Sequence, residues 1–411
     1  MTDFSKLARK ITWVLFANQS LASAGFIAAA TINSILGAQL GGSDYWTGVP
    51  TAVYLLGSAF AASVWGILMD RIGRRNSMVW GLLIGVVGNL LALFAISTSS
   101  LITFLAGMVL MGITNAVVVL GRFAAAEVNP PEKRGEAISQ VVWGGTFGAV
   151  VGPLLVGPMG SFVKTFGMNE LAGAYLSTLI MFGAAAVVVA IGLRPDPREL
   201  GKEIAALYPQ PVRHENTRSL REIMREPAAL TALSTMVIGQ VVMVALMVIT
   251  SRHMNHHQHG LADISRVIQG HTIGMYAFSV VTGYLVDKWG RRAVILSGAG
   301  MLMLACIMAP LSPDVFPLAV ALFFLGLGWN FCFVGGSTLL ADQLSPAERS
   351  RTQGFNDLLV GLASAFASLG SGLIFAATSY TVISIVAGIL SLVPFIMVVY
   401  RLREKTVVVS A

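Results

Sequence analysis

The sequence predicts an all-helical membrane protein whose twelve transmembrane helices form two pseudo-symmetric six-helix bundles. Three observations lead to this prediction: charged residues are scarce, uncharged stretches recur at bilayer length, and a basic turn occurs twice. Only 11% of the 411 residues are charged and 55% are hydrophobic, with a mean hydropathy of +0.75. Soluble domains carry about 25% charged residues. Lipid is therefore the solvent expected for most of this chain, and a cytosolic enzyme is excluded.

The uncharged stretches give the number of membrane-crossing helices. Ten stretches lack Asp, Glu, Lys and Arg and reach about 20 residues, the length that a helix needs to cross a bilayer core. They cover residues 11–43, 45–69, 76–121, 137–163, 171–193, 227–251, 267–286, 293–313, 315–341 and 358–400. Two of them are long enough for two crossings, and polar residues break these two near Ser97 and near Thr378. Barrel strands would alternate and would be about half as long, so the prediction is twelve helices.

The Lys and Arg residues predict the orientation of the chain. There are 27 of them, and all but Lys164, Arg252 and Arg266 fall at the termini, in the central loop, or at and after the ends of even-numbered spans. Loops rich in Lys and Arg stay in the cytoplasm, so we expect a multi-pass protein of the cell (inner or plasma) membrane with both termini cytoplasmic. The same bias explains the net charge of +7. No basic domain lies outside the loops, so a nucleic-acid partner is not expected.

The chain contains an internal repeat. The segment Gly66–Arg75 follows the second span and Gly283–Arg292 follows the eighth, with Gly, Leu, Asp, Gly, Arg and Arg at matching places. A second echo, at nearly the same offset, relates Pro131–Arg134 to Pro346–Arg349. The predicted domains are therefore a six-helix bundle over 1–193, a cytoplasmic central loop over 194–226, and a second six-helix bundle over 227–411.

Two six-helix units, each with a basic turn between its second and third helices, resemble the major facilitator superfamily over nearly the whole chain. In that superfamily the turn's Asp lies near the start of helix eleven, and its cations pair with acids to latch the cytoplasmic side. The resemblance implies gating roles for Gly66, Asp70, Arg71, Gly73, Arg74 and Arg75, and for Asp287, Lys288, Gly290, Arg291 and Arg292 in the second copy. Gly73 can take a positive φ, and Gly66 lets the second helix approach a neighbour.

Arg74 has two candidate partners in this latch. Asp357 is expected at the start of helix eleven, and Glu127 at the cytoplasmic end of helix four. The alternative is that the cations of the turn only set the topology.

The fifth helix carries a glycine pattern. Gly148, Gly152, Pro153 and Gly157 match the superfamily's G-x-x-x-G-P-x-x-G-G motif, which goes with exporters, although Val156 replaces the first of the last two glycines. The resemblance favours efflux. Plain helix packing is the alternative, because small residues four apart occur in many membrane helices.

The sequence offers few groups that could carry a proton. No Asp or Glu lies deep in a predicted span, and Met108 stands where the exporters often carry Arg, four residues before Gly112. A midplane carboxylate is the usual proton carrier in transporters, so ordinary proton antiport is not expected. His271, in the outer half of helix eight, is the titratable side chain that lies well inside a span. The alternatives are a hydrogen-bonded packing histidine and one facing the outer vestibule.

Uncharged polar side chains at mid-span must face the bundle interior, because lipid offers them no partner. They come from helices one, four, seven and ten, where the superfamily places its cavity. The substrate-cavity candidates are Asn18, Gln19, Tyr54, Asn115, Trp143, Gln240, His271, Tyr276, Trp329 and Asn330. Each polar one could instead serve as a helix–helix hydrogen bond. A neutral, aromatic cavity suits an uncharged or amphipathic solute.

The predicted outer loop after helix seven is rich in histidine. His253, His256, His257 and His259 could bind a metal such as Zn²⁺ through their imidazoles. Their spacing matches no defined zinc motif, so a polar outer loop is the alternative.

The expected function is secondary active transport of a small organic solute by alternating access, in the direction of efflux, with protons as a possible coupling partner. The partners are the small-molecule substrate and the lipid bilayer; no cofactor, no enzymatic activity and a monomer are expected. One alternative is a divalent metal-ion transporter that uses the outer histidines. A non-transporting membrane sensor or an intramembrane enzyme is disfavoured, because the sequence has no P-loop and no H-E-x-x-H motif.

Overall fold

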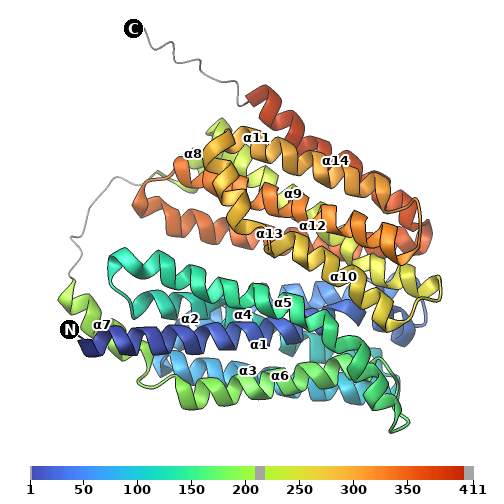
Figure 1. Ribbon diagram of the computed structural model, residues 1–411, viewed down its shortest axis with the longest axis horizontal. Helices are drawn as coiled ribbons and strands as arrows, with labels where there is room; N and C mark the ends of the chain where they lie inside the picture. The colour runs from blue at the N-terminus through green and yellow to red at the C-terminus, as the bar shows by residue number, and fades with distance from the viewer. Residues whose placement is uncertain (1, 209–217, 402–411) are drawn as a thin grey trace. The chain divides into compact units, whose positions relative to one another are not determined.

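Figure 1 shows a computed structural model of the chain, which describes residues 2–208 and 218–401. These described residues form helices and turns, with no strand among them. The α-helices are α1 (Thr2–Gly41), α2 (Val49–Ile72), α3 (Arg74–Thr98), α4 (Leu101–Glu127), α5 (Arg134–Lys164), α6 (Ala172–Gly192), α7 (Pro197–Leu207), α8 (Leu220–Ile223), α9 (Pro227–His256), α10 (Leu261–Tyr276), α11 (Ser279–Met308), α12 (Val315–Asp342), α13 (Pro346–Ala377) and α14 (Tyr380–Arg401). Two short 3₁₀ helices, η1 (Asp44–Trp46) and η2 (Pro131–Lys133), complete them.

The helices confirm the predicted all-helical membrane fold. Within the described residues, 11 helical stretches are long and apolar enough to cross a membrane. One of them, Leu261–Met308, has 48 residues, about twice what one crossing needs. It breaks between α10 and α11, and again at Gly290, whose φ of 83° and ψ of 160° interrupt α11. This stretch therefore contains the eighth and ninth predicted spans.

The two long uncharged runs break where the sequence predicts. Ser99 ends α3 with a φ of 53°, and the side chain of Ser100 caps α4 by accepting a hydrogen bond from the Thr103 N–H. The second run breaks between Ala377 and Tyr380.

The predicted position of Asp357 at a helix start is wrong. Helix α13 begins at Pro346, and Asp357 is its twelfth residue. The helix starts early because proline suits a first turn and because Glu348 accepts a hydrogen bond from the Ser345 N–H at 3.0 Å. An uncharged run marks only the part of a helix that lies in lipid. It cannot locate the start of α13, because a helix end that lies in water can contain charged residues.

The described chain divides into two compact units. The first contains α1 to α7 together with Val248–Gln269 and Ser368–Ala377, and the second contains the rest. The ends of α9, α10 and α13 that are predicted to face outward thus pack with the first six spans.

Glycines allow the closest helix contacts inside each unit. A Cβ on Gly144 or Gly152 of α5 would lie 2.5 Å from a backbone oxygen of α1, and one on Gly148 would also meet the α1 backbone. In the second unit, a Cβ on Gly328 of α12 would lie 2.9 Å from the Gly298 oxygen of α11. Close backbone approach through small residues is how helices associate in lipid. Gly144, Gly148 and Gly152 therefore have a packing role against α1.

Candidate functional site

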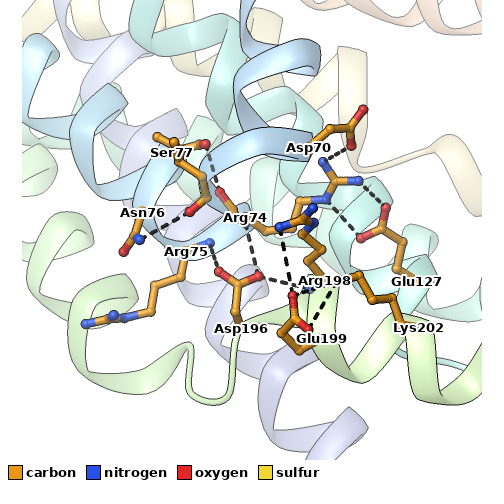
Figure 2. A network of polar contacts seen from close by, with 12 residues as sticks. Asp70, Arg74, Arg75, Asn76, Ser77, Glu127, Asp196, Arg198, Glu199 and Lys202 are labelled. Carbon is orange, nitrogen blue, oxygen red and sulfur yellow. Dashed lines mark hydrogen bonds and ion pairs between the residues drawn. The ribbon is translucent and has the colours of Figure 1, made fainter.

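The turn between α2 and α3 is built around Gly73 and a carboxylate from the central loop. Gly73 has φ 90° and ψ 162° and provides no side-chain cap for α3. Asp196, which precedes α7, supplies that cap: its carboxylate accepts hydrogen bonds from the N–H of Arg74 at 3.1 Å and of Arg75 at 3.0 Å. The same carboxylate caps α7 through the Arg198 N–H at 2.9 Å (Figure 2). A negative group at a helix N-terminus satisfies free N–H groups and the helix dipole, so Asp196 joins two helix starts.

Arg74 connects this turn to two acids. Its guanidinium donates two hydrogen bonds to Glu127, at 3.0 and 2.5 Å, and one to Asp70 at 2.8 Å (Figure 2). Glu127 is the last residue of α4, so one of the two expected partners of Arg74 lies in this network. Paired N–H···O bonds of this kind are strong and fix geometry. Arg75 instead donates to the Ala190 carbonyl of α6 at 2.9 and 3.1 Å.

The second copy of the turn repeats this geometry in the other unit. Gly290 has nearly the same dihedral angles as Gly73, and Arg291 donates to Asp342 at 2.8 Å. Asp342 ends α12 as Glu127 ends α4. Asp342 was absent from the predicted gating set, although its offset from Glu127 equals that of the Pro131 and Pro346 segments and could have revealed it.

The gating roles expected of Gly66 and Asp357 stay predictions. No heavy atom of the described chain lies within 4 Å of a Cβ built on Gly66, nor on its counterpart Gly283. Asp357 accepts a hydrogen bond from Gln353 on its own helix at 2.9 Å. In the second turn, Lys288 lies 5.7 Å from the ring of Tyr284.

The buried carboxylate of Glu348 binds Arg218, near the C-terminal end of the central loop. Sequence analysis did not predict this contact. Glu348 is 2% exposed and receives two side-chain hydrogen bonds from Arg218, at 2.9 and 2.8 Å, and one from the Arg218 N–H at 2.9 Å. The Arg218 guanidinium holds the pKa of the Glu348 carboxyl well below its usual range. The signal was present as Ser345-Pro-Ala-Glu348, the spacing of a helix capping box.

Two of the polar cavity candidates of the first unit are hydrogen-bonded to nearby serine side chains. Asn115 donates to Ser58 of α2 at 3.0 Å, and Gln19 donates to Ser23 one turn along α1 at 3.1 Å. Asn18 is buried, and its Oδ1 atom has no hydrogen-bond partner among the described residues. Tyr54 packs 5.8 Å from the ring of Phe26.

The candidates of the second unit separate into two groups. The Trp329 indole donates to Gln240 at 2.6 Å, stacks on Phe333 at 5.1 Å, and meets Tyr276 edge-on at 6.1 Å. These four side chains, which we call the aromatic–amide cluster, are half-buried. Asn330, by contrast, is buried and hydrogen-bonded to Thr282 and Ser279 side chains and to the Met275 carbonyl. The side-chain oxygen and nitrogen of Asn330 are therefore both bonded to α10 or α11.

Trp143 lies on a distinct face of α5. Its side chain is 60% exposed. It lies seven and fourteen residues before Val150 and Gly157, so the three share one face of the helix. Val150 and Gly157 contact α10, through Gln269 at 3.5 Å and through Ala262. Trp143 therefore lies on the same face of α5 as these two contact residues.

The side chain of His271, a residue of α10, is enclosed against α12. Its ring is fully buried, Nδ1 lies 3.0 Å from the Leu322 carbonyl, and Nε2 has no hydrogen-bond partner within the described residues. A Cβ on Gly326 of α12 would collide with the His271 backbone. The vestibule interpretation of His271 is therefore wrong, and the packing and proton-carrier interpretations are left.

The four outer histidines point to different partners. His253 and His257 meet edge-on at 4.7 Å, whereas His256 lies 3.4 Å from Asp44. His259 lines a cavity with Arg252. Across residues 2–208 and 218–401, no three His, Cys, Asp or Glu side chains are grouped so that they could hold a metal ion.

The repeated turns, the bilayer-length helices and the polar side chains at mid-span define a multi-pass membrane transporter made of two related halves. The chain belongs to the Major Facilitator Superfamily, whose family model matches residues 15–268 and 241–410. It is a secondary transporter of small molecules and not an enzyme.

Similar proteins cover almost the whole chain. The uncharacterized MFS-type transporter YdeG of Bacillus subtilis (strain 168) is 35% identical over 96% of this chain and 92% of its own. The riboflavin transporter RfnT of Brucella anthropi is 29% identical over 98% of both chains. The solved structure of the nucleoside transporter NupG has a TM-score of 0.70 with 13% identity, covering 97% of this chain and 100% of that one; this similarity shows the fold.

Proposed function

We propose that this transporter exports a small, uncharged or amphipathic organic solute by alternating access. The observation that carries the solute class is the aromatic–amide cluster of Gln240, Tyr276, Trp329 and Phe333. Its flat rings favour planar groups, and the amide of Gln240, fixed by the indole, supplies polar atoms without net charge. A relative named for riboflavin, whose ring system is planar, is consistent with this class.

Contacts at the two ends of the helices support alternating access. At the end predicted to face outward, Arg252 of α9 pairs with Asp44, and Ser368 of α13 donates to the Gly48 carbonyl at 2.7 Å. At the predicted cytoplasmic end, the pair of Arg74 and Glu127 and that of Arg291 and Asp342 each lie inside one unit. Alternating access requires that each end can be joined or released in turn.

Two further features support the direction of transport and its energy source. The glycine pattern of α5 supports efflux, since it matches the exporters' motif. For proton coupling, His271 is the candidate carrier, because its buried Nε2 can accept a proton.

Transport by reconstituted protein tests the proposal. We expect proteoliposomes to transport planar aromatic solutes and to reject dicarboxylates and divalent metal ions. Trp329→Ala should raise the KM about tenfold, which corresponds to about 1.4 kcal/mol of lost stacking. The matched control is Trp80→Ala, because Trp80 of α3 is 60% exposed and outside the cluster. Transport of metal ions alone, or equal effects of the two variants, would contradict the proposal.

A further inference from the structure

The segment that joins α1 to α2 presents a fixed carboxylate at the predicted outer end. Ser43 caps the short helix η1, and the Thr47 hydroxyl donates to the Asp44 carbonyl at 2.6 Å. A Cβ on Gly37 of α1 would lie 2.5 Å from the Trp46 carbonyl, so the segment lies tight against that helix. The backbone of Asp44 is therefore held in place, and its side chain has a defined direction.

Two cationic or titratable side chains of α9 meet this carboxylate. Arg252 donates to one Asp44 oxygen at 2.7 Å, and His256 Nε2 lies 3.4 Å from the other. The two are four residues apart and so lie on the same helix face. We propose that Asp44, Arg252 and His256 form a proton-responsive lock, which closes the outer end and is strengthened when His256 binds a proton. This inference rests on the proposed alternating access.

The chemistry of the imidazole gives the direction of the response. A neutral histidine offers one donor and one acceptor nitrogen, whereas a protonated one offers two donors and a positive charge. At 3.4 Å the contact of His256 with Asp44 is long for a neutral hydrogen bond. A proton on His256 turns it into a charge-assisted bond with Asp44, which shortens and strengthens it. Histidine changes charge between pH 5 and 8, so external acid favours the closed lock.

Other charged groups surround the lock and tune it. Arg252 of α9 opposes a second positive charge, His253 lies one turn before His256, and His257 is the residue directly after it. The neighbouring cavity of 440 Å³ is lined by Arg252, His259 and Glu170, the last from the segment between α5 and α6. Asp44 is the carboxylate in contact with His256. The cavity lies on the Arg252 side of the lock.

The lock also connects to α13. Gly48, four residues after Asp44, accepts the hydrogen bond of Ser368, and a Cβ on Gly372 would lie 2.7 Å from the Gly48 nitrogen. The ring of His256 lies 5.6 Å from that of Phe375 on the same helix. One short segment therefore joins α9 and α13, and releasing Asp44 loosens both contacts.

A thiol placed at the α13 contact reports whether the lock is open. Ser368 is fully buried, so Ser368→Cys should react with an external, membrane-impermeant thiol reagent only after the segment moves away. The buried Cys306 and Cys332 are replaced by Ala in this background. Rates are divided by those of the same thiol in Asp44→Asn, which lacks the lock. This ratio removes the thiol's own dependence on pH; Asp44→Ala, which also lacks the carboxylate, replaces Asp44→Asn if the latter does not fold.

We expect the normalised rate to fall about three- to tenfold between external pH 7.5 and 5.5, the range of one histidine titration. His256→Gln should abolish this fall, and the control His257→Gln should keep it, because His257 packs on His253 instead of Asp44. A fall that persists in His256→Gln, or a rate that rises with acid, overturns the lock. Persistent transport without labelling of any variant instead refutes alternating access at this end, on which the lock depends.

Discussion

Replacing Gly73 by alanine tests whether the central loop is part of the turn between α2 and α3. The substitution has two costs. The dihedral angles of Gly73, φ 90° and ψ 162°, belong to a region nearly exclusive to glycine, and a side chain there costs about 1–3 kcal/mol. The new Cβ would also lie 2.5 Å from an Asp196 carboxylate oxygen. Asp196 would have to move, and losing its helix cap costs about 0.5–2 kcal/mol more.

The repeat provides a matched control in Gly290→Ala. Gly290 has φ 83° and ψ 160°, but no described atom lies within 4 Å of its built Cβ. Its alanine variant therefore has the backbone cost alone, about 1–3 kcal/mol. Gly73→Ala should lower the free energy of unfolding by about 0.5–2 kcal/mol more than Gly290→Ala does.

Chemical denaturation in detergent micelles, followed by a separate fluorescent label in each unit, measures both values, because two units need not unfold together. A double-mutant cycle then isolates the contact. In an Asp196→Ala background, the cost of Gly73→Ala should fall to that of Gly290→Ala. Equal costs in the native background, or a Gly73→Ala cost that Asp196→Ala leaves unchanged, would show that the loop carboxylate does not belong to the turn.

Three further predictions concern single side chains. Arg218 lowers the folded-state pKa of Glu348, so the carboxylate stabilises the fold above its unfolded pKa of about 4.3 and loses this effect as the pH falls. Glu348→Gln should be less stable at pH 7, and its free energy of unfolding should change less between pH 5 and 3. Parallel pH profiles of the two proteins would argue against the pair. Asn330→Ala should lower the free energy of unfolding by about 1–3 kcal/mol without altering solute preference in the transport assay, whereas a changed preference at full stability would place Asn330 in the cavity. His271→Gln should abolish uphill transport while downhill exchange persists in proteoliposomes; a loss of folded protein instead would identify a packing histidine.

The sequence predicted the elements that depend on local chemistry. Uncharged runs located the spans, because a helix in lipid must be apolar over its own length. The repeated Gly73 and Gly290 were found because the tight reversal requires specific residues in a fixed order. The start of α13 was predicted wrongly, although the sequence contains a local signal for it. Ser345 and Glu348 have the spacing of a capping box, but the search for uncharged runs takes no account of helix caps.

Pairings across the chain were decided by the tertiary structure. The sequence places Arg252 and Asp44 208 residues apart, Arg218 and Glu348 130 apart, and the Asp196 cap 122 residues from Arg74. An ion pair or a helix cap forms where the fold brings a donor close to an acceptor. The periodicity of the sequence does not predict which distant residues meet in this way. Thus hydropathy and charge by themselves determined which segments of this protein cross the membrane. Only the packing of those segments decided that Arg74 bonds Glu127, that Asn330 bonds α10 and α11, and that His256 meets Asp44, because these contacts depend on distances between helices and not on spacing along them.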